Sequence, residues 1–224
     1  MGHHRIPLPN PSGADGAGAE LGGILLTGGA SRRLGTDKTI LSHRGTTLAG
    51  SVAALLDQVV SAAVEVGPGV TGLPHVSEDP PGSGPLAGIA AGWEALTESF
   101  AFRGGGPSAA LVVAGDMPLL TRELLELLSS GPPGCSAVPV VRGRLQFLCA
   151  RYSERALGAA GELSRSGYRA VGQLAVEGCA DLLGPRWWGP VVEEKVFSDL
   201  DVPGDLVLLD GGADPTGTPH ERNG

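Results

Sequence analysis

A thirteen-residue segment near the start of the chain, L-T-G-G-A-S-R-R-L-G-T-D-K from Leu26 to Lys38, gathers residue types that bind phosphate. It follows a short apolar run typical of a buried strand. Paired glycines let backbone N–H groups approach an anion without obstruction from a Cβ, while a hydroxyl and two cations add donors and positive charge. The residues expected to form this phosphate-binding loop are Gly28, Gly29, Ser31, Arg33, Gly35 and Lys38.

The lysine in this loop stands out against the composition. The chain has fourteen arginines but only two lysines, Lys38 and Lys195. Where arginine is the usual cation, a lysine in a glycine-rich loop favours a compact point charge for a polyphosphate. The alternative is an ordinary glycine-rich turn with surface charges. The spacing fits neither the P-loop nor G-x-G-x-x-G, which disfavours a dinucleotide-binding dehydrogenase.

Three groups of carboxylates are candidate ligands. Asp116 follows the apolar run 109–114, and ligands of open α/β sheets bind at the carboxyl ends of such strands. One carboxylate there suits Mg²⁺, which takes one or two carboxylates plus phosphate oxygens and water. Asp79 precedes two prolines and a glycine-rich turn, and Asp199 and Asp201 are two apart, so on an extended chain they point to one face. The alternatives are a helix cap for Asp116 and a turn residue for Asp79.

These residues need a sheet to bring them together, and the first half of the chain predicts one. Short apolar runs bounded by glycine predict buried strands, and segments with helical spacing lie between them. This alternation predicts a parallel α/β sheet with right-handed crossovers. The predicted strands are 21–26, 62–66 and 109–114, and the predicted helices are 47–59, 86–96 and 121–128, the last with Thr121 as N-cap.

The second half has a different pattern. Apolar runs at 136–141 and 145–152 flank Arg142–Arg144, which predicts a β-hairpin or antiparallel insertion. Helical spacing then extends from 153 to about 176. A final strand at 191–197 and a short helix at 203–209 complete the prediction.

Composition sets the outer limits. With 224 residues, 42% of them apolar, the chain fits one domain with a sizeable core. A net charge of −8 argues against nucleic-acid or anionic-membrane binding, and no apolar run approaches the ~18 residues of a membrane span. Residues 1–20 and 211–224 hold few large apolar groups and are expected to be flexible tails around a single domain at 21–210. The opening M-G-H-H is treated as a tag remnant.

The cysteines indicate the compartment. Cys135, Cys149 and Cys179 are odd in number and lack C-x-x-C spacing, which predicts a reducing, cytoplasmic environment with neither a disulfide framework nor a zinc site. Cys135 and Cys149 lie in apolar surroundings and are expected to be buried thiols.

The phosphate-binding segment closely resembles the signature of the molybdenum cofactor guanylyltransferases, usually (L)xGGxSxRMGxDK. The resemblance covers most of residues 21–210. It recurs in the family's order at four further places: E-D-P-P-G-S-G-P-L-A-G-I (78–89), A-G-D-M-P (114–118), G-R-L-Q-F-L-C-A-R-Y (143–152) and F-S-D-L-D-V-P-G-D-L (197–206). It implies a three-layer, Rossmann-like nucleotidyltransferase fold, with a mostly parallel sheet and a small antiparallel insertion.

The resemblance also implies roles for the matching residues. The catalytic residues would be Lys38, Arg33 and Asp116. The nucleotide would contact Leu26, Thr27 and Gly28 largely through their backbone, together with Gly29, Ser31, Gly35, Lys38, Asp79 and Asp116. Mg²⁺ would bind Asp116, with Asp201 as a second contact.

The reaction implied is transfer of GMP from GTP to molybdenum-molybdopterin, with release of pyrophosphate. The acceptor phosphate is already anionic at neutral pH, so no general base is required. The partners would be GTP, the molybdenum-bound pterin, and cofactor-biosynthesis or acceptor proteins. The pterin would lie against the second half of the chain, near Gln146 and the loop at Asp199.

Three alternatives stay open at this point. CMP transfer to the same pterin is disfavoured because such relatives tend to read L-A-A-G where this chain reads L-T-G-G. The others are a nucleotidyltransferase for another small phosphorylated acceptor and a non-catalytic nucleotide-binding regulatory module. The presence of Lys38 and Asp116 argues against the last.

The chain departs from the family pattern at several positions. Val202 and Gly204 replace the usual Thr and Glu after the aspartate pair, and Leu34 replaces Met. Phe147 stands where Pro is common, and Gly67 stands near a frequent Asn, so a side-chain contact to the base is lost there.

Overall fold

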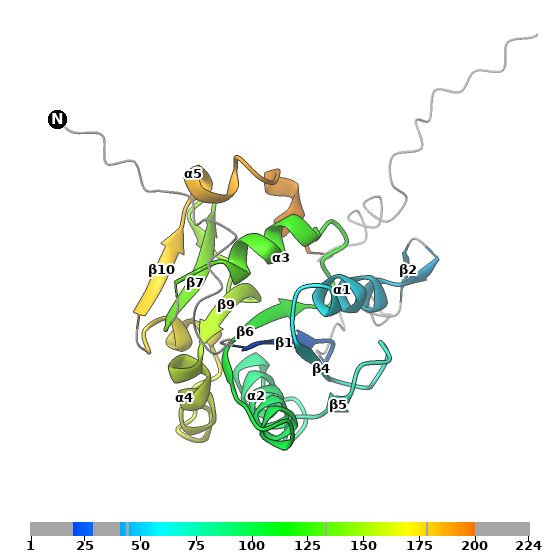
Figure 1. Cartoon of the computed structure of the whole chain (residues 1–224), viewed down its shortest axis with the longest axis vertical. Helices are drawn as coiled ribbons and strands as arrows, with labels where there is room; N and C mark the ends of the chain where they lie inside the picture. The colour runs from blue at the N-terminus through cyan, green and yellow to red at the C-terminus, as the bar shows by residue number, and fades with distance from the viewer. Residues whose placement is uncertain (1–19, 29–40, 44, 133, 178, 200–224) are drawn as a thin grey trace, which may run out of the picture.

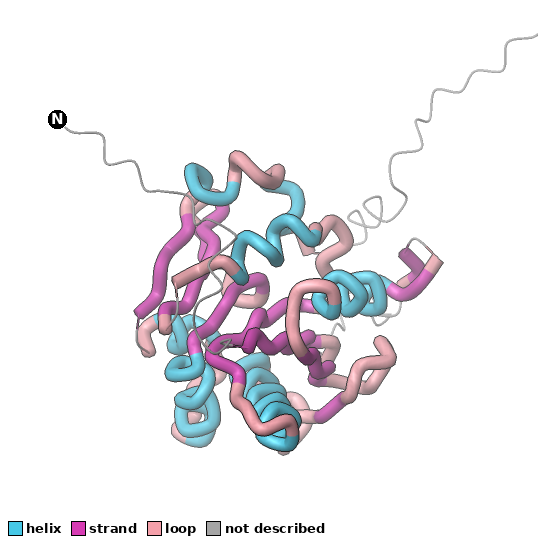
Figure 2. Tube along the Cα trace, in the orientation of Figure 1, coloured by secondary structure: helices cyan, strands magenta, loops and turns pink. Residues whose placement is uncertain are grey.

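The protein is built around a mixed sheet flanked by helices on both faces (Figures 1 and 2). The computed structural model describes residues 20–28, 41–43, 45–132, 134–177 and 179–199. Within them the strand order is β10-β7-β9-β6-β1-β4-β5, with β8 paired to β7. The strands are β1 (Glu20–Leu26), β4 (Ala62–Val66), β5 (His75–Val76), β6 (Pro107–Ala114), β7 (Cys135–Val141), β8 (Arg144–Leu145), β9 (Cys149–Ser153) and β10 (Cys179–Leu183), and β2 (Ser42–His43) and β3 (Thr46–Thr47) form a separate ladder.

Strand direction follows the predicted pattern. β1 pairs in parallel with both β4 and β6, β5 extends this group from β4, and β10 pairs in parallel with β7. β9 is antiparallel to both β6 and β7. The sheet is therefore mostly parallel with a small antiparallel insertion, and the fold class predicted from the sequence is confirmed.

Helices cover the two faces of the sheet in two layers. α2 (Pro85–Phe102) and α4 (Glu154–Arg165) lie on one face, and α1 (Leu48–Asp57) and α3 (Arg122–Ser129) on the other (Figure 1). Alternate side chains of β1 serve the two layers, since Ile24 and Leu26 pack in the α2–α4 core while Leu25 packs in the α1–α3 core.

Side-chain caps fix the start of three helices. Thr47 Oγ1 accepts a hydrogen bond from Gly50 N at 3.0 Å, and Thr121 Oγ1 accepts one from Leu124 N at 3.4 Å. Ser153 Oγ accepts one from Ala156 N at 3.4 Å. Each satisfies a backbone donor that the first turn of a helix leaves free. The helix starts predicted at 47, 121 and 153 are confirmed.

The predicted helix 153–176 is wrong in its extent. α4 ends at Arg165, and a short 3₁₀ segment, η2 (Val171–Ala175), follows. Gly167 has φ +91°, and its N–H donates to Ser164 O while Tyr168 N donates to Leu163 O. This pair of hydrogen bonds is a Schellman motif, which ends a helix at a left-handed glycine.

The predicted strand at 191–197 is also wrong. Glu194–Phe197 forms a 3₁₀ turn, η3, and the strand that completes the sheet is β10. Trp188, Val192 and Val196 recur every four residues and bury one face in the α1–α3 core. The predicted strand 145–152 is divided into β8 and β9, and the predicted helix 203–209 lies outside the described residues.

The cysteine prediction needs a correction. Cys135 and Cys179 form a disulfide with their Cα atoms 4.6 Å apart, so Cys135 is not a free thiol. They are directly paired first residues of β7 and β10, a juxtaposition that their separation of 44 residues conceals. Cys149 is buried and free as predicted, and burial raises the pKa of its thiol to about 12.

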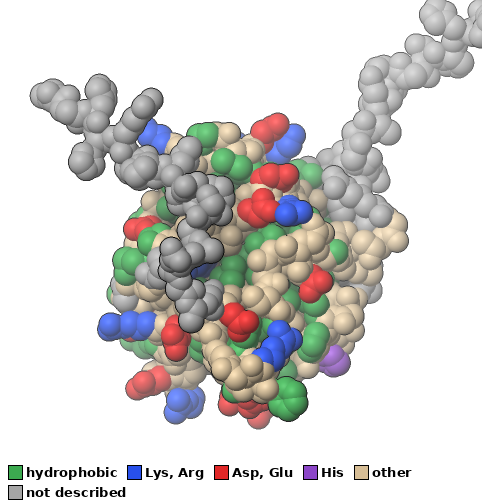
Figure 3. Space-filling model, in the orientation of Figure 1, with side chains coloured by type: hydrophobic (Ala, Val, Ile, Leu, Met, Phe, Trp, Pro, Cys, Tyr) green, Lys and Arg blue, Asp and Glu red, His purple; other side chains and the backbone are tan. Residues whose placement is uncertain are grey.

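The visible surface shows no extended basic patch. In Figure 3 acidic and basic side chains are interspersed among polar and apolar groups on the face shown. No helix in the described part of the chain has the length and apolar character needed to cross a bilayer.

Two aromatic rings attach the C-terminal segment to the domain. Trp188, in α5 (Pro185–Trp188), meets Phe197 edge-to-face with ring centroids 5.1 Å apart. Trp188 Nε1 donates to Val140 O at 3.3 Å, and both rings are more than nine-tenths buried. Trp188 and Phe197 therefore fix the chain just before Asp199. Both rings pack in the same core as Met117, which is adjacent to Asp116 in the sequence.

We expect Phe197→Ala to destabilise the protein by roughly 3–4 kcal/mol, because it removes a buried ring and leaves a cavity beside Trp188. Phe102→Ala is the matched control, since Phe102 is 96% exposed, and should change the free energy of unfolding by less than about 0.5 kcal/mol. Urea unfolding of both variants measures the difference. Equal effects would show that Phe197 is not an anchor.

Candidate active site

The carboxyl ends of four parallel strands form one edge of the sheet. β6, β1, β4 and β5 are neighbours in that order. Asp116 follows β6, Thr27 and Gly28 follow β1, Gly67 follows β4, and Asp79 lies three residues beyond β5. This is the edge at which open α/β sheets bind their ligands.

The ends of the central strands approach each other unusually closely. Val66 O accepts hydrogen bonds from both Thr27 N and Gly28 N, each at 3.0 Å. A Cβ on Gly67 would lie 2.2 Å from Thr27 Oγ1 and 2.6 Å from Gly28 N. Glycine at 67 is thus a steric requirement in this chain.

These hydrogen bonds restrict how the start of the loop could touch a nucleotide. The N–H groups of Thr27 and Gly28 are engaged with Val66, and Leu26 O accepts from Gly115 N at 2.9 Å. Leu26 and Thr27 are buried, while Gly28 is exposed. A backbone contact from these residues would therefore use the carbonyl of Thr27 or the open face of Gly28.

Asp116 and Asp79 lie at opposite ends of this edge. Asp116 is half-buried and Asp79 is exposed. Three strand spacings separate β6 from β5, so the ends of those strands are roughly 14 Å apart. The two carboxylates therefore follow strands that are not neighbours in the sheet.

Asp79 belongs to a tight turn that leads into α2. Glu78 Oε1 accepts from Gly82 N at 3.0 Å, and Ser83 Oγ donates to Pro80 O at 2.6 Å. α2 then begins with Pro85 after Gly84, which has φ +98°. The turn places Asp79 beside the positive end of an eighteen-residue helix.

Several predicted site residues fall where the structure gives no description. They are Gly29, Ser31, Arg33, Gly35, Lys38 and Asp201. The structure does describe Gly28, which belongs to the phosphate-binding segment and is the last described residue after β1. Gly28 lies at the centre of the edge, between the ends of β4 and β6.

The antiparallel insertion adds a second half to the same edge. β9 runs opposite to β6, so its first residues meet the carboxyl end of β6, where Ala114 N donates to Leu148 O at 2.8 Å. Gln146 N donates to Pro139 O at 2.9 Å, which places Gln146 on the β7 side. Asp116 therefore stands between the predicted nucleotide residues and Gln146.

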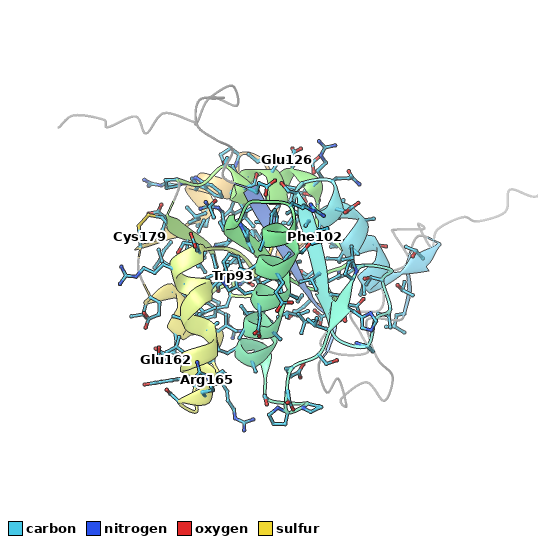
Figure 4. All side chains as sticks on the ribbon, turned by 60° about the horizontal axis from the view of Figure 1, so that its bottom comes forward. Trp93, Phe102, Glu126, Glu162, Arg165 and Cys179 are labelled. Atoms are coloured by element: carbon cyan, nitrogen blue, oxygen red, sulfur yellow. A yellow bond between two sulfur atoms is a disulfide. The ribbon has the colours of Figure 1, made fainter. Side chains whose placement is uncertain are left out.

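A hollow of about 440 Å³ lies between α2 and α4 and reaches Asp79. Trp93 and Arg165, labelled in Figure 4, are among its lining residues. Its volume is that of a small-molecule site. Residues from the ends of β1, β4 and β6 do not line it. The hollow is therefore a separate cavity on the α2–α4 side of the sheet, next to the strand ends that form the candidate site.

One buried carboxylate was missed by the sequence reasoning. Glu65 lies in β4 and its side chain is fully buried. Its two oxygens accept hydrogen bonds from Thr27 Oγ1, Gly69 N, Val70 N, Thr71 N and Thr71 Oγ1, at 2.6–2.9 Å. The signal was the single charged residue in the apolar run A-A-V-E-V.

The hydrogen bonds decide the ionisation of Glu65. Burial by itself raises the pKa of a carboxyl group, but the donors from Thr27, Thr71 and the loop backbone outweigh it and hold the pKa below its ordinary 4.5. The carboxylate thus adds stability above the pKa of the unfolded chain, and this stability is lost as the pH falls through the folded pKa.

We expect Glu65→Gln to lower the free energy of unfolding at neutral pH by roughly 2–4 kcal/mol, because the amide NH₂ would face backbone donors. The variant should also lose less stability than the wild type between about pH 6 and pH 3. Urea unfolding across that range measures both effects. Glu98→Gln, at an exposed position of α2, is the control; an unchanged acid dependence in Glu65→Gln would contradict the assignment.

In the described residues, no group of three or more His, Cys, Asp or Glu side chains forms a metal-binding cluster. Asp116 nevertheless fits Mg²⁺, because this ion is commonly held by one or two carboxylates while substrate phosphates and water complete its coordination. Asp116 is half-buried just beyond the carboxyl end of β6.

Curated proteins with similar sequences include molybdenum cofactor guanylyltransferases. The chain is 31% identical over 205 residues to a "Probable molybdenum cofactor guanylyltransferase" of Chloroflexus aggregans, covering 84% of this chain and 93% of that protein. It is 36% identical over 121 residues to a "Molybdenum cofactor guanylyltransferase" of Rhodobacter capsulatus, covering 50% of this chain and 60% of the relative.

The fold has counterparts among solved structures. The molybdopterin-guanine dinucleotide biosynthesis protein A of Archaeoglobus fulgidus superposes with a TM-score of 0.65 at 21% identity, covering 84% of this chain and 97% of that one. The family model described as "MobA-like NTP transferase domain" matches residues 23–177, from β1 to the segment before β10. The strands and turns that form the candidate site lie within this match, and the chain belongs to the MobA-like NTP transferase domain family.

Proposed function

We propose that this protein transfers GMP from GTP to molybdenum-molybdopterin, giving the guanine dinucleotide form of the cofactor and releasing pyrophosphate. The names of the curated relatives support this reaction. The observation that carries it is the divided edge of the sheet, where Asp116 lies between the predicted nucleotide residues and the half that contains Gln146. A transfer between two phosphorylated substrates requires such an arrangement.

The chemistry needs positioning more than proton transfer. An oxygen of the acceptor's terminal phosphate attacks the α-phosphorus of GTP, a new P–O bond forms, and the bond to the β-phosphate oxygen breaks. The attacking oxygen is already anionic, so the protein need not supply a base. Lys38 and Arg33 would neutralise charge on the triphosphate and leaving pyrophosphate.

Asp116 would hold Mg²⁺, with Asp201 as a second contact. When bound, the ion would neutralise phosphate charge and align the triphosphate. Asp79, which follows β5 and not β6, would contact the nucleotide. Gln146 and the segment at Asp199 would contact the pterin from the other half of the edge.

We infer that the reaction takes place in the cytoplasm, because an odd number of cysteines without C-x-x-C spacing is typical of a reducing compartment. Among the described residues, the Cys135–Cys179 disulfide points the other way, since disulfides persist mainly in oxidising compartments. It joins two strands at the opposite end of the strand order from β1, β4 and β5, away from the proposed nucleotide half.

Calorimetric titration of the full chain with GTP, CTP and ATP in the presence of Mg²⁺ tests the nucleotide. We expect GTP to bind at least about tenfold more tightly than the other two. Preference for CTP would overturn the proposed substrate while leaving the fold unaffected.

Pyrophosphate release with GTP and the pterin acceptor tests the reaction. Asp116→Asn should reduce turnover by roughly 100-fold or more, because it removes the proposed metal carboxylate. Asp57→Asn, at the exposed end of α1, is the control and should retain wild-type turnover. An Asp116→Asn variant with unchanged turnover and unchanged Mg²⁺ dependence would show that the metal assignment is wrong.

A further inference from the structure

We propose that Glu65 is a positioning residue for nucleotide binding: it joins the end of β1 to the loop between β4 and β5, and so sets the place at which the phosphate-binding segment leaves the sheet. The inference rests on the proposed function. Because Glu65 is fully buried, it would act through Thr27 and would not touch the nucleotide.

The first connection runs to β1. Thr27 Oγ1 donates to Glu65 Oε1 at 2.6 Å, and the Thr27 side chain is itself buried. Thr27 immediately precedes Gly28, where the phosphate-binding segment begins. With Thr27 N also bound to Val66 O, β4 fixes both the backbone and the side chain of this residue.

The second connection runs to the β4–β5 loop, residues 67–74. Gly69 N and Val70 N donate to Oε1, each at 2.9 Å, while Thr71 N and Thr71 Oγ1 donate to Oε2 at 2.9 and 2.7 Å. Successive backbone N–H groups converge on an anion in this way in the nests that bind phosphate. Here the anion is the protein's own carboxylate, and the loop folds around it.

The loop in turn leads to the other end of the proposed nucleotide site. Glu65 N donates to Pro74 O at 2.8 Å, and Gly67 N donates to Val76 O at 2.9 Å, which attaches β5 to β4. The turn with Glu78 and Asp79 follows directly. A Cβ at Gly28 would lie 3.8 Å from Glu78 Oε2. The turn after β5 therefore returns to the start of the phosphate-binding segment at the end of β1.

The chemistry of the donors explains why a carboxylate is needed. All five groups that contact the side chain donate hydrogen bonds, and an ionised carboxylate only accepts them. An amide would present two N–H groups to the same donors. The charge therefore serves to order Thr27 and the loop together.

Two threonines provide a matched test. Thr27 and Thr71 each donate one hydroxyl to Glu65, at 2.6 and 2.7 Å, but only Thr27 leads into the phosphate-binding segment. Thr27→Val and Thr71→Val each remove that hydroxyl with little change of shape. A role in stability alone predicts that they behave alike in both unfolding and GTP binding.

Positioning predicts that they differ in nucleotide binding. We expect Thr27→Val to raise the Kd for GTP with Mg²⁺ by about tenfold or more and to raise KM more than it lowers kcat. Thr71→Val should stay within about twofold of wild type in both. Thr27→Ser retains the hydroxyl and should bind GTP like the wild type. Equal Kd values for the two valine variants, or a Thr27→Ser variant as weak as Thr27→Val, would overturn the inference.

A double-mutant cycle separates action of Glu65 through Thr27 from an independent contact by Thr27. If Glu65 acts through Thr27, Glu65→Gln should raise the Kd for GTP, and adding Thr27→Val should raise it little further. Additive effects would show that Thr27 contacts the nucleotide independently. If Glu65→Gln does not fold, the comparison of Thr27→Val, Thr27→Ser and Thr71→Val decides the matter without it.

The wild-type titration distinguishes this inference from the function on which it rests. A wild type that does not bind GTP overturns the proposed function and the role of Glu65 with it. A wild type that binds GTP, with valine variants that cannot be told apart, overturns only the role of Glu65.

Discussion

The close approach of β1 and β4 at their carboxyl ends is the constraint on which the rest of the candidate site depends. One carbonyl, Val66 O, accepts from two successive N–H groups of β1, and there is no room for a side chain at Gly67. This contact brings the start of the phosphate-binding segment against the loop that leads to Asp79. The same edge holds Asp116 on the other side of β1, so the positions of the predicted ligands follow from strand order.

A buried charge next to a phosphate-binding segment would be costly unless it was fully hydrogen-bonded. Glu65 meets that condition, since five donors surround its two oxygens. These hydrogen bonds hold the β4–β5 loop, residues 67–74, in a fixed position next to the ends of β1 and β4. Such buried networks are rigid when every member is satisfied, and rigidity at the end of β1 is what a site for a flexible triphosphate requires.

The antiparallel insertion gives the family fold its second half. Because β9 runs against β6, residues before β9 reach the edge where the parallel strands end. A wholly parallel sheet would place helices or their connections there. The anchor formed by Trp188 and Phe197 then brings the segment at Asp199 from beyond the sheet to the side of the domain that holds Met117.

The sequence by itself determined the features that depend on near neighbours. The strands at 21–26, 62–66 and 109–114 and the helix starts near 47, 121 and 153 follow from local apolar patterns. The cap at Thr121 follows from a side chain that bonds three residues ahead. The sequence motifs likewise identified the family, because each motif is a continuous segment and their order can be read directly from the sequence. It also indicated Asp79 and Asp116, and the place of Asp116 at a strand end follows from the predicted strand 109–114. The strand β5 before Asp79 was not predicted from the sequence.

Only the tertiary structure decided the features whose partners are distant along the chain. Glu65 looked like an irregularity in a buried strand until Thr27, 38 residues away, was placed beside it. Cys135 meets Cys179, 44 residues away, only because β7 and β10 pair in register. For the same reason β10 replaced the predicted strand at 191–197: an edge strand is selected by the neighbour it pairs with, and a local apolar pattern does not record that neighbour.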